Sequence, residues 1–309
     1  MWNVRALLLW GVFGLLAALA PGLRAADTFS VATYNLENYI DETAGSRRPK
    51  TEAAKEKIRQ IIRAMKPDVL AVEEIGGTNT LLALRASLNA DGLNYPHWSH
   101  VTGFDTNIHV AVLSRFPFSV CRPHTNEGFL LNGRRFRVGR GFAEVDVQVN
   151  AGYTFTLIAA HLKSRREVPQ ADEAELREQE AVVLRGIIDF RLRADPDMNL
   201  IVLGDFNDLK DSRPIRTIIG RGKNSLIDTR PAESNGEGPA AFRGAAGRNV
   251  TWTYYFHKDD TYSRVDYLLL SRGMAREWQT NATYVLALPG WGIASDHRPV
   301  IASFLAQDK

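Results

Sequence analysis

Acidic, amide and imidazole side chains stand at or near the ends of apolar segments at widely separated points of this 309-residue chain. They are Asn35, Glu74, His161, Asp205, Asn207, Asp296 and His297. Strand ends are where α/β folds gather functional groups from distant parts of the sequence. Carboxylate and amide oxygens suit hard cations such as Mg²⁺, Mn²⁺ or Ca²⁺. With imidazoles beside them, such ligands favour attack by water on a phosphoester.

The segment 204–208 carries the strongest single signal. Gly204 permits a tight bend, and Asp205 and Asn207, two positions apart in an extended segment, point the same way. They could hold a metal-bound or attacking water, although the same residues could also form an Asx turn. Asn35 alone could be a turn residue, and His161 alone a hydrogen-bonded histidine at a strand end. The prediction of a reaction site therefore depends on the combination.

Other chemistries lack their sequence patterns. A zinc site would show HExxH or paired CxxC spacing, and neither is present. There is no P-loop and no G-x-S-x-G turn. Cys121 is the only cysteine, which excludes an intramolecular disulfide, and its place after a strand-like run predicts a partly buried thiol. Stability must then come from burial of a core.

Strand and helix patterns alternate along the chain and would position these side chains. Strands are expected at 28–34, 69–72, 110–113, 142–149, 155–160, 199–203, 265–270 and 300–304. Helical spacing appears at 51–65, around 81–88 and at about 171–193. Because no low-complexity linker divides the chain, we expect residues 26–309 to form one mixed α/β domain.

The first 25 residues have a different composition from the remainder. A basic start with Arg5, an uncharged stretch at 6–20 and small residues before Asp27 predict a signal peptide over 1–25 and a secreted or periplasmic protein. The alternative is an uncleaved anchor, because the apolar stretch is near the upper length for a signal. No later segment is long and apolar enough to cross a bilayer. We expect a monomer without stable membrane association after cleavage.

Seven short motifs, taken in order, resemble those of the endonuclease/exonuclease/phosphatase superfamily. They are TYNLEN (33–38), LAVEE (70–74), VLSR (112–115), HL (161–162), GDFN (204–207), RVDY (264–267) and SDH (295–297). The resemblance covers nearly all of residues 28–304. It implies an α/β fold, a four-layer sandwich of two central mixed β-sheets flanked by helices, with the site at one end. It also implies a deoxyribonuclease-like, metal-dependent phosphoesterase.

The resemblance implies roles for individual residues. Glu74 would be the principal metal carboxylate, with Asn35 close to the metal or to a phosphoryl oxygen. Asp205 and Asn207 would position the attacking water and bind the phosphate. Glu73, the neighbour of Glu74, is expected to be structural.

A second group of residues would act at the scissile phosphate. His297 would work there, oriented by Asp266, while Asp296 would contribute to the metal site. His161 would donate to the phosphate or the leaving group, as in branches resembling pancreatic-type deoxyribonucleases and bacterial sphingomyelinases. Abasic-site repair nucleases typically carry a different residue at that position.

Basic residues near these motifs could meet an anionic substrate. Arg140 matches a phosphate-contacting arginine of the family, and Lys163 and Arg165 follow His161 directly; a solvated loop is the alternative for the last two. No apolar, aromatic-tipped hairpin of the kind with which sphingomyelinases dock on membranes is evident. The nearest candidate, 253–257, is expected to be core and strand.

Three functions remain open. A nuclease acting on nucleic acid is expected, with Mg²⁺ (or Mn²⁺ or Ca²⁺) as cofactor; it predicts a basic groove containing Arg140, Lys163, Arg165 and Arg264, and a steep salt dependence. The alternative is a lipid or small-molecule phosphodiesterase or phosphatase. A non-catalytic binding module should have lost some of these side chains, yet every expected position holds a competent one. The basic pI is weak evidence for nucleic acid, because signal cleavage leaves 36 basic against 35 acidic residues.

Overall fold

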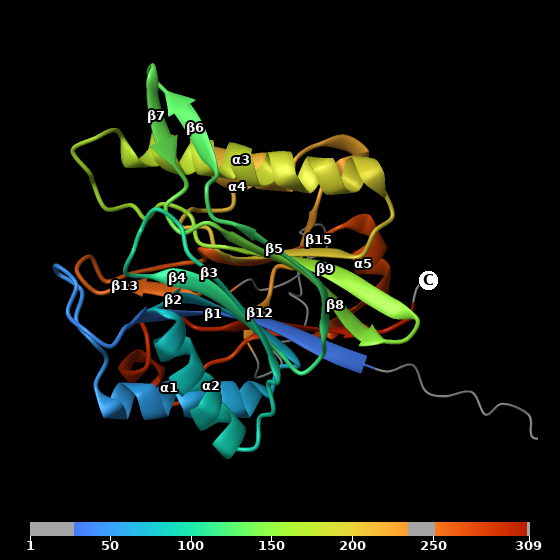
Figure 1. Ribbon diagram of the computed structural model, residues 1–309, viewed down its shortest axis with the longest axis horizontal. Coiled ribbons are helices and arrows are strands. Elements are labelled where there is room, and N and C mark those ends of the chain that lie inside the picture. Colours follow the sequence, from blue (N-terminus) through green and yellow to red (C-terminus); the bar gives the residue numbers. More distant parts are fainter. Residues whose placement is uncertain (1–27, 234–250, 308–309) are drawn as a thin grey trace, which may run out of the picture.

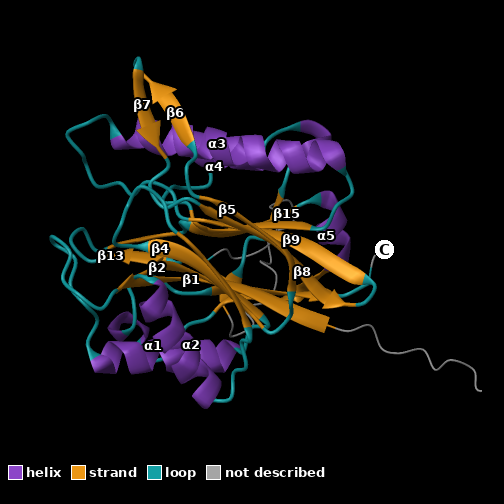
Figure 2. Ribbon diagram, viewed as in Figure 1, coloured by secondary structure: helices purple, strands orange, loops and turns teal. Residues whose placement is uncertain are grey.

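Two large mixed sheets pack face to face in the computed structural model, which describes residues 28–233 and 251–307 (Figure 1). Helices α1 and α2 lie on the outer side of one sheet, and α3 and α4 lie on the outer side of the other (Figure 2). The expected four-layer α/β sandwich is thereby confirmed. The predicted signal peptide, residues 1–25, falls outside the described residues.

The first sheet has the strand order β12-β16-β17-β1-β2-β4-β3. Its strands are β1 (Thr28–Tyr39), β2 (Val69–Ile75), β3 (His97–Val101), β4 (His109–Ser114), β12 (Ala232–Glu233), β16 (Trp278–Val285) and β17 (Val300–Leu305). Since β1 and β2 run parallel, their carboxyl ends lie at the same edge of the sheet. Helices α1 (Glu52–Met65) and α2 (Thr78–Ala90) cover the outer face. Helix α1 begins where the Thr51 hydroxyl accepts the Ala54 N–H and ends at Lys66, before a proline.

The second sheet has the strand order β11-β15-β10-β9-β8-β5. Its strands are β5 (Phe118–His124), β8 (Phe142–Asn150), β9 (Tyr153–Ala160), β10 (Leu200–Asp205), β11 (Ile227–Asp228) and β15 (Asp266–Leu270). Here β9 and β10 form the parallel pair. Helices α3 (Glu173–Ala194) and α4 (Arg213–Ile219) cover this sheet.

Short elements complete the described chain. Two hairpins stand apart from the large sheets, β6 (Gly128–Leu131) with β7 (Arg134–Arg137) and β13 (Tyr254–Phe256) with β14 (Thr261–Ser263). The other elements are the helix α5 (Arg272–Glu277) and the 3₁₀ turns η1 (Gly222–Asn224) and η2 (Trp291–Ile293).

The main core fills the space between the two sheets. Val31 and Val112 of the first sheet meet Leu157, Leu203 and Leu268 of the second in one buried cluster. Residues at the alternate positions of the same strands pack under the helices. Both faces of the central strands are therefore buried, which explains their almost continuous apolar sequences. Each such side chain contributes about 1.5–3 kcal/mol on full burial.

The surface differs from the sequence prediction at Cys121. This thiol is exposed, so the prediction that it would be partly buried is wrong. It lies on β5, which is an edge strand with mostly exposed side chains.

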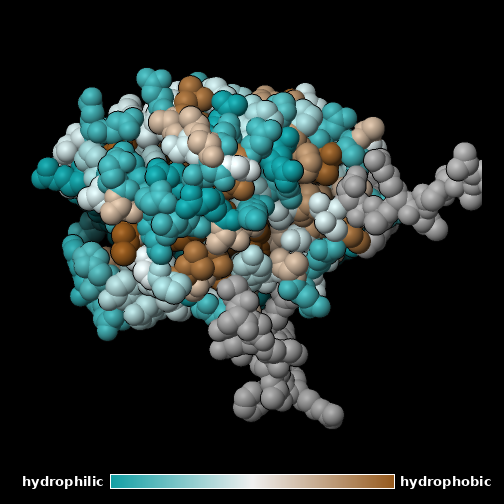
Figure 3. Space-filling model, turned by 90° about the horizontal axis from the view of Figure 1, so that it is seen from below, coloured by the Kyte–Doolittle hydropathy of each residue, from teal (hydrophilic) through white to brown (hydrophobic). Residues whose placement is uncertain are grey.

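The face covered by α1 and α2 is mostly hydrophilic with small apolar spots (Figure 3). Within the described ranges, no helix combines the length and apolar character needed to span a bilayer.

Candidate active site

All eight residues expected at the reaction centre lie together at one end of the sandwich. They come from the ends of β1, β2, β9 and β10, from the start of β15 and from the segment before β17: Asn35, Glu74, His161, Asp205, Asn207, Asp266, Asp296 and His297. Two parallel strand pairs, β1–β2 in the first sheet and β9–β10 in the second, explain this arrangement, because parallel strands end at the same edge of a sheet.

A close approach of β9 and β10 brings two of these groups side by side. Gly204 has a φ of +130°, and a Cβ atom at this position would overlap the carbonyl oxygen of Ala160. Only glycine lets the backbones approach this closely. The residues that follow, His161 and Asp205, then lie with the His161 Nε2 atom 3.5 Å from the Asp205 Oδ2 atom.

A β-bulge separates the two neighbouring glutamates of β2. The register of β2 against β4 shifts between Glu73 and Ile75, and Glu74 takes a left-handed φ of +60°. The bulge turns the Glu74 side chain out of the sheet, where its Oε1 atom lies 3.9 Å from His161 Nε2. Glu73 stays fully buried and accepts a hydrogen bond of 2.7 Å from the Thr33 hydroxyl.

The Asp205 carboxylate accepts three hydrogen bonds within the site. Its Oδ2 atom accepts from the side-chain amides of Asn35 at 2.9 Å and Asn207 at 3.2 Å, and its Oδ1 atom accepts the Asn207 backbone N–H at 2.8 Å. Burial raises the pKa of Asp205 to about 7, although the His297 cation and these hydrogen bonds act in the opposite direction. The oxygen of Asn35 accepts the Glu37 backbone N–H at 2.9 Å, which fixes the amide toward Asp205.

His297 and Asp266 form a buried hydrogen-bonded pair. The His297 Nδ1 atom lies 2.9 Å from the Asp266 Oδ2 atom, and its Nε2 atom lies 3.7 Å from Asp205. Burial lowers the pKa of His297, but the carboxylates of Asp266, Asp205 and Asp296 outweigh burial and raise it well above its ordinary value. The hydroxyls of Thr253 and Ser295 accept the backbone N–H groups of Asp266 and His297, so both backbones are fixed.

The pKa of His161 is shifted in the opposite direction to that of His297. The His161 side chain is almost fully buried, and burial lowers the pKa of its imidazole well below the ordinary value, with the Arg140 cation acting in the same direction. Its Nε2 atom faces the carboxylates of Glu74 and Asp205, whereas its Nδ1 atom has no hydrogen-bond partner among the described residues. A neutral imidazole with the proton on Nε2 fits these surroundings.

Two sets of side chains at the site contain carboxylates that could bind a divalent cation. Potential ligand atoms of Asp205, Asp266 and His297 all lie within 4.8 Å of one another. The Asp266 Oδ2 atom already binds His297 Nδ1, so we describe this trio as a hydrogen-bonded network, in which the Asp266 Oδ1 atom has no hydrogen-bond partner among the described residues. Glu74 and Asp296, with side chains 19% and 31% exposed, stand at the open mouth of the site.

The charges at this mouth fit a bound cation. Burial raises the pKa of Asp296 to about 7. The His297 cation acts in the opposite direction, whereas the negative charges of Glu37 and Glu74 also raise this pKa. Carboxylates that repel one another in a partly buried site are stabilised by a hard cation. The residues present therefore suit a divalent metal held by Glu74 and Asp296 beside Asp205.

The three basic residues expected to bind substrate occupy different surroundings. Arg140 is buried and donates to the Leu162 carbonyl at 3.2 Å, directly after His161. Arg165 lies at the rim, 47% exposed, and donates to the Asn207 carbonyl at 3.2 Å. The Lys163 ammonium donates to the backbone carbonyls of Ser164 and Arg166 in its own loop.

Two further residues modify the sequence-based description. Arg264, expected in a basic groove, instead makes two hydrogen bonds of 2.9 and 2.6 Å to Asp228. Tyr254, expected in the core, is only half-buried, and its ring centroid lies 4.7 Å from that of His297. Its segment does form the expected strand. A single sequence gives no sign of this contact, because an isolated bridge across the chain pairs Tyr254 with His297.

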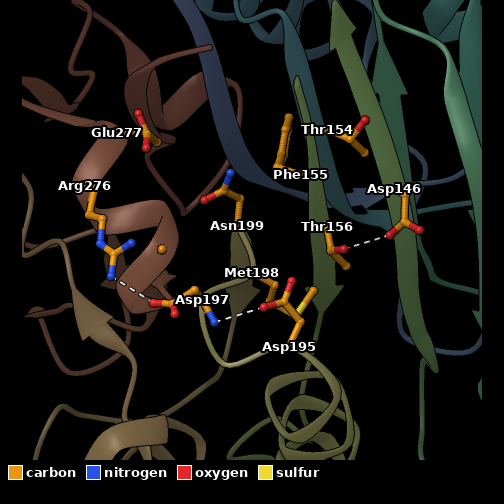
Figure 4. A pocket seen from close by; sticks show the side chains of 11 residues that line it. Asp146, Thr154, Phe155, Thr156, Asp195, Asp197, Met198, Asn199, Arg276 and Glu277 are labelled. Atoms are coloured by element: carbon orange, nitrogen blue, oxygen red, sulfur yellow. Dashed lines mark hydrogen bonds and ion pairs between the residues drawn. The ribbon is translucent and has the colours of Figure 1, made fainter. Parts of the chain in front are cut away.

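A polar pocket elsewhere in the molecule is separate from this site. It is lined by residues from the starts of β9 and β10, whereas the site lies at their ends (Figure 4). Its acids have partners within the protein: Thr156 donates to Asp146 at 2.8 Å, and Arg276 lies 2.8 Å from Asp197. The pocket therefore lies at the opposite ends of β9 and β10 from the site.

The family model described as Endonuclease/Exonuclease/phosphatase family matches residues 32–297. No curated relative matches the chain closely enough to be compared.

Several solved structures share the fold at low identity. Truncated Caenorhabditis elegans TDP2 is 16% identical, with 90% of this chain and 98% of that chain covered and a TM-score of 0.58. Sphingomyelinase C from Streptomyces griseocarneus is 19% identical, with 90% and 99% covered and a TM-score of 0.57. The 3′ phosphatase NExo from Neisseria, bound to a product DNA hairpin, is 18% identical, with 89% and 99% covered and a TM-score of 0.58. At these identities the likeness establishes the fold alone.

Proposed function

The chain belongs to the endonuclease/exonuclease/phosphatase family, whose members are metal-dependent phosphoesterases, and we propose that it is an exported nuclease. It would hydrolyse phosphodiester bonds of nucleic acid with the help of a divalent cation, Mg²⁺ or alternatively Mn²⁺ or Ca²⁺. The predicted signal peptide supports a secreted or periplasmic location. A monomer suffices, since all eight residues of the site come from one chain.

The buried Asp266–His297 pair facing Asp205 carries this proposal. Asp205, with a pKa raised to about 7, accepts the proton of the attacking water. His297, kept protonated by Asp266, donates a hydrogen bond to a phosphoryl oxygen as negative charge develops there. The water oxygen bonds to phosphorus, the bond to the leaving oxygen breaks, and that oxygen takes a proton from solvent.

Other side chains would hold the substrate in line. Neutral His161 donates from Nε2 to the phosphate or the leaving group, and Asn207 donates to the phosphate. Glu74 and Asp296 would hold the cation, with Asn35 fixing Asp205 beside them, and the cation supplies charge stabilisation at the phosphoryl oxygens.

The basic residues favour a polyanionic substrate. Arg140 would bind the phosphate next to the cleaved one, while Arg165 and Lys163 would border the strand at the rim. Lys163 needs a change of rotamer to do so, because its ammonium now binds its own loop.

A second candidate is a phosphodiesterase with a cationic headgroup substrate, such as sphingomyelin. One observation favours it: a pocket beside the site is lined by Glu37, Tyr255, His257, Trp291 and Asp296. Aromatic faces combined with carboxylates bind quaternary ammonium groups through cation–π and charge attraction. The pocket lies next to a proposed metal carboxylate, so it could accept the group attached to a bound phosphate.

A substrate panel decides between the two candidates. The mature protein is assayed with Mg²⁺, Mn²⁺ or Ca²⁺ on single- and double-stranded nucleic acid, sphingomyelin vesicles, bis(p-nitrophenyl) phosphate and small phosphate monoesters. We expect cleavage of nucleic acid that a chelator abolishes. Turnover of sphingomyelin without turnover of nucleic acid would replace the first proposal with the second. Activity that survives complete removal of metal would contradict both.

A further inference from the structure

The β6–β7 hairpin projects beyond α3 and has two different faces (Figure 1). Phe129 and Phe136 are paired across the hairpin and stack with ring centroids 5.9 Å apart, and Phe129 packs against the core under α3. Because side chains alternate along a strand, the other face carries Leu130, Arg135 and Arg137. All three are exposed, and Leu130 is 68% exposed.

The two outward arginines are available to a ligand. Among the residues that the structure describes, neither Arg135 nor Arg137 has an acidic partner within salt-bridge distance. Arg134, on the inward face, differs, since it donates to the Gln170 carbonyl at 3.3 Å and lies over the Phe136 ring. Positions 135 and 137 are two apart on one strand, which places their Cα atoms about 7 Å from each other on the same side.

This face leads directly to the candidate active site. Only Val138 and Gly139 separate Arg137 from the buried Arg140, so the Cα atoms of the two arginines are at most about 11 Å apart. The loop beside this connection presents Phe104, which is 68% exposed. Its backbone N–H donates to the Val138 carbonyl at 3.4 Å, and the next N–H, of Asp105, donates to the Gly139 carbonyl at 2.7 Å. The hairpin base and this loop are therefore fixed to each other at the rim.

We propose that the outward face of β6–β7, together with Phe104, holds a nucleic-acid strand that runs on from the scissile phosphate. This inference rests on the proposed nuclease function. Arg135 and Arg137 would bind consecutive backbone phosphates, which match the planar guanidinium fork. Phe104 would stack on a base, a contact that tolerates any base sequence. A lipid surface fits less well, because Leu130 is the single apolar side chain on this face of the hairpin, and interfacial anchors need a broader apolar area.

The double variant Arg135→Ala/Arg137→Ala tests the inference. We expect the KM for a long single-stranded oligonucleotide to rise about tenfold, and the slope of log kcat/KM against log salt to become shallower by about 1.4, or about 0.7 for each lost phosphate contact. Hydrolysis of bis(p-nitrophenyl) phosphate, which is too small to reach the hairpin, reports whether the site is intact. Arg193→Ala is the matched control, since this exposed arginine lies at the far end of α3, about 30 Å along the helix.

The outcomes separate the inference from the proposed function. An unchanged KM and salt slope for the double variant, with a wild type that cleaves the oligonucleotide, overturns the hairpin's role alone. Equal losses in Arg193→Ala overturn it too, because the effect would then be general charge. If the wild type cleaves no nucleic acid, the nuclease proposal fails. Binding of a fluorescent oligonucleotide to the chelated protein then still decides whether the hairpin holds a strand. Loss of binding to phosphatidylserine vesicles without a change in oligonucleotide affinity would assign the face to lipid instead.

Discussion

Replacing Asp266 with asparagine should remove the charge that keeps His297 protonated. Asp266 Oδ2 lies 2.9 Å from His297 Nδ1, and both side chains are buried. Asparagine has almost the same shape, and its amide oxygen can still accept the Nδ1 proton. The variant therefore changes charge with little change in packing.

The size of the effect follows from the two distances. At an effective dielectric constant of about 20, a unit charge 2.9 Å away attracts the imidazolium by about 6 kcal/mol, and one at 3.7 Å, the distance of Asp205, by about 4–5 kcal/mol. Asp266 thus supplies more than half of the attraction from these two neighbours. Losing it lowers the pKa of His297, so the decline of rate with rising pH begins at a lower pH. At neutral pH we expect kcat to fall about 10²–10⁴-fold.

The assay measures kcat and kcat/KM of Asp266→Asn against pH, with bis(p-nitrophenyl) phosphate and saturating Mg²⁺. Asp228→Asn is the control, because Asp228 on the adjacent strand β11 is also a largely buried, ion-paired carboxylate, bound to Arg264. Breaking such a pair costs about 3–5 kcal/mol of stability but should leave the pH profile unchanged. A rate for Asp266→Asn within threefold of wild type, or an identical pH profile, would refute the role given to the pair.

Two other predictions concern stability. Gly204→Ala should lower the free energy of unfolding in urea by about 3 kcal/mol or more, because the added methyl overlaps the β9 backbone at a φ of +130°. The helical control Gly186→Ala, which has open space around it, should raise that free energy by about 0.5–1 kcal/mol, and equal effects would contradict the close approach. In chelated protein, Tm should fall as pH rises from about 4 to 8. The pKa values of Asp205 and Asp296 are raised to about 7 in the fold from 3.8, so the stability that they contribute is complete below the unfolded pKa and is lost through about pH 7. His161, with its lowered pKa, opposes this trend. Adding Mg²⁺ should reverse most of the fall, and a Tm independent of both pH and Mg²⁺ would be evidence against a carboxylate metal site.

Local patterns were sufficient to predict much of the fold. Alternating and continuous apolar runs predicted the central strands, and the 3.6-residue spacing of Ile58, Ile61 and Ile62 predicted α1. Edge features were harder, because exposure at an edge depends on which strand pairs with which. Cys121 is exposed for this reason. The sequence around Leu130 and Arg135 does not predict a projecting hairpin either, since its mixture of apolar and basic residues is that of an ordinary surface.

The chemical types of the site residues and their order can be predicted from the chain alone, since strand ends followed by Asn, Glu, His and Asp are local features. At Gly204 the sequence predicts only a tight bend, because the need for glycine comes from the close approach of β9. Which of these groups meet depends on tertiary contacts. The bulge in β2 selects Glu74 for the site and leaves Glu73 in the core, and pairing across the chain places Tyr254 against His297 while Arg264 binds Asp228. These outcomes depend on strand register and on contacts between residues far apart in the chain, and neither is encoded in the spacing of neighbouring residues.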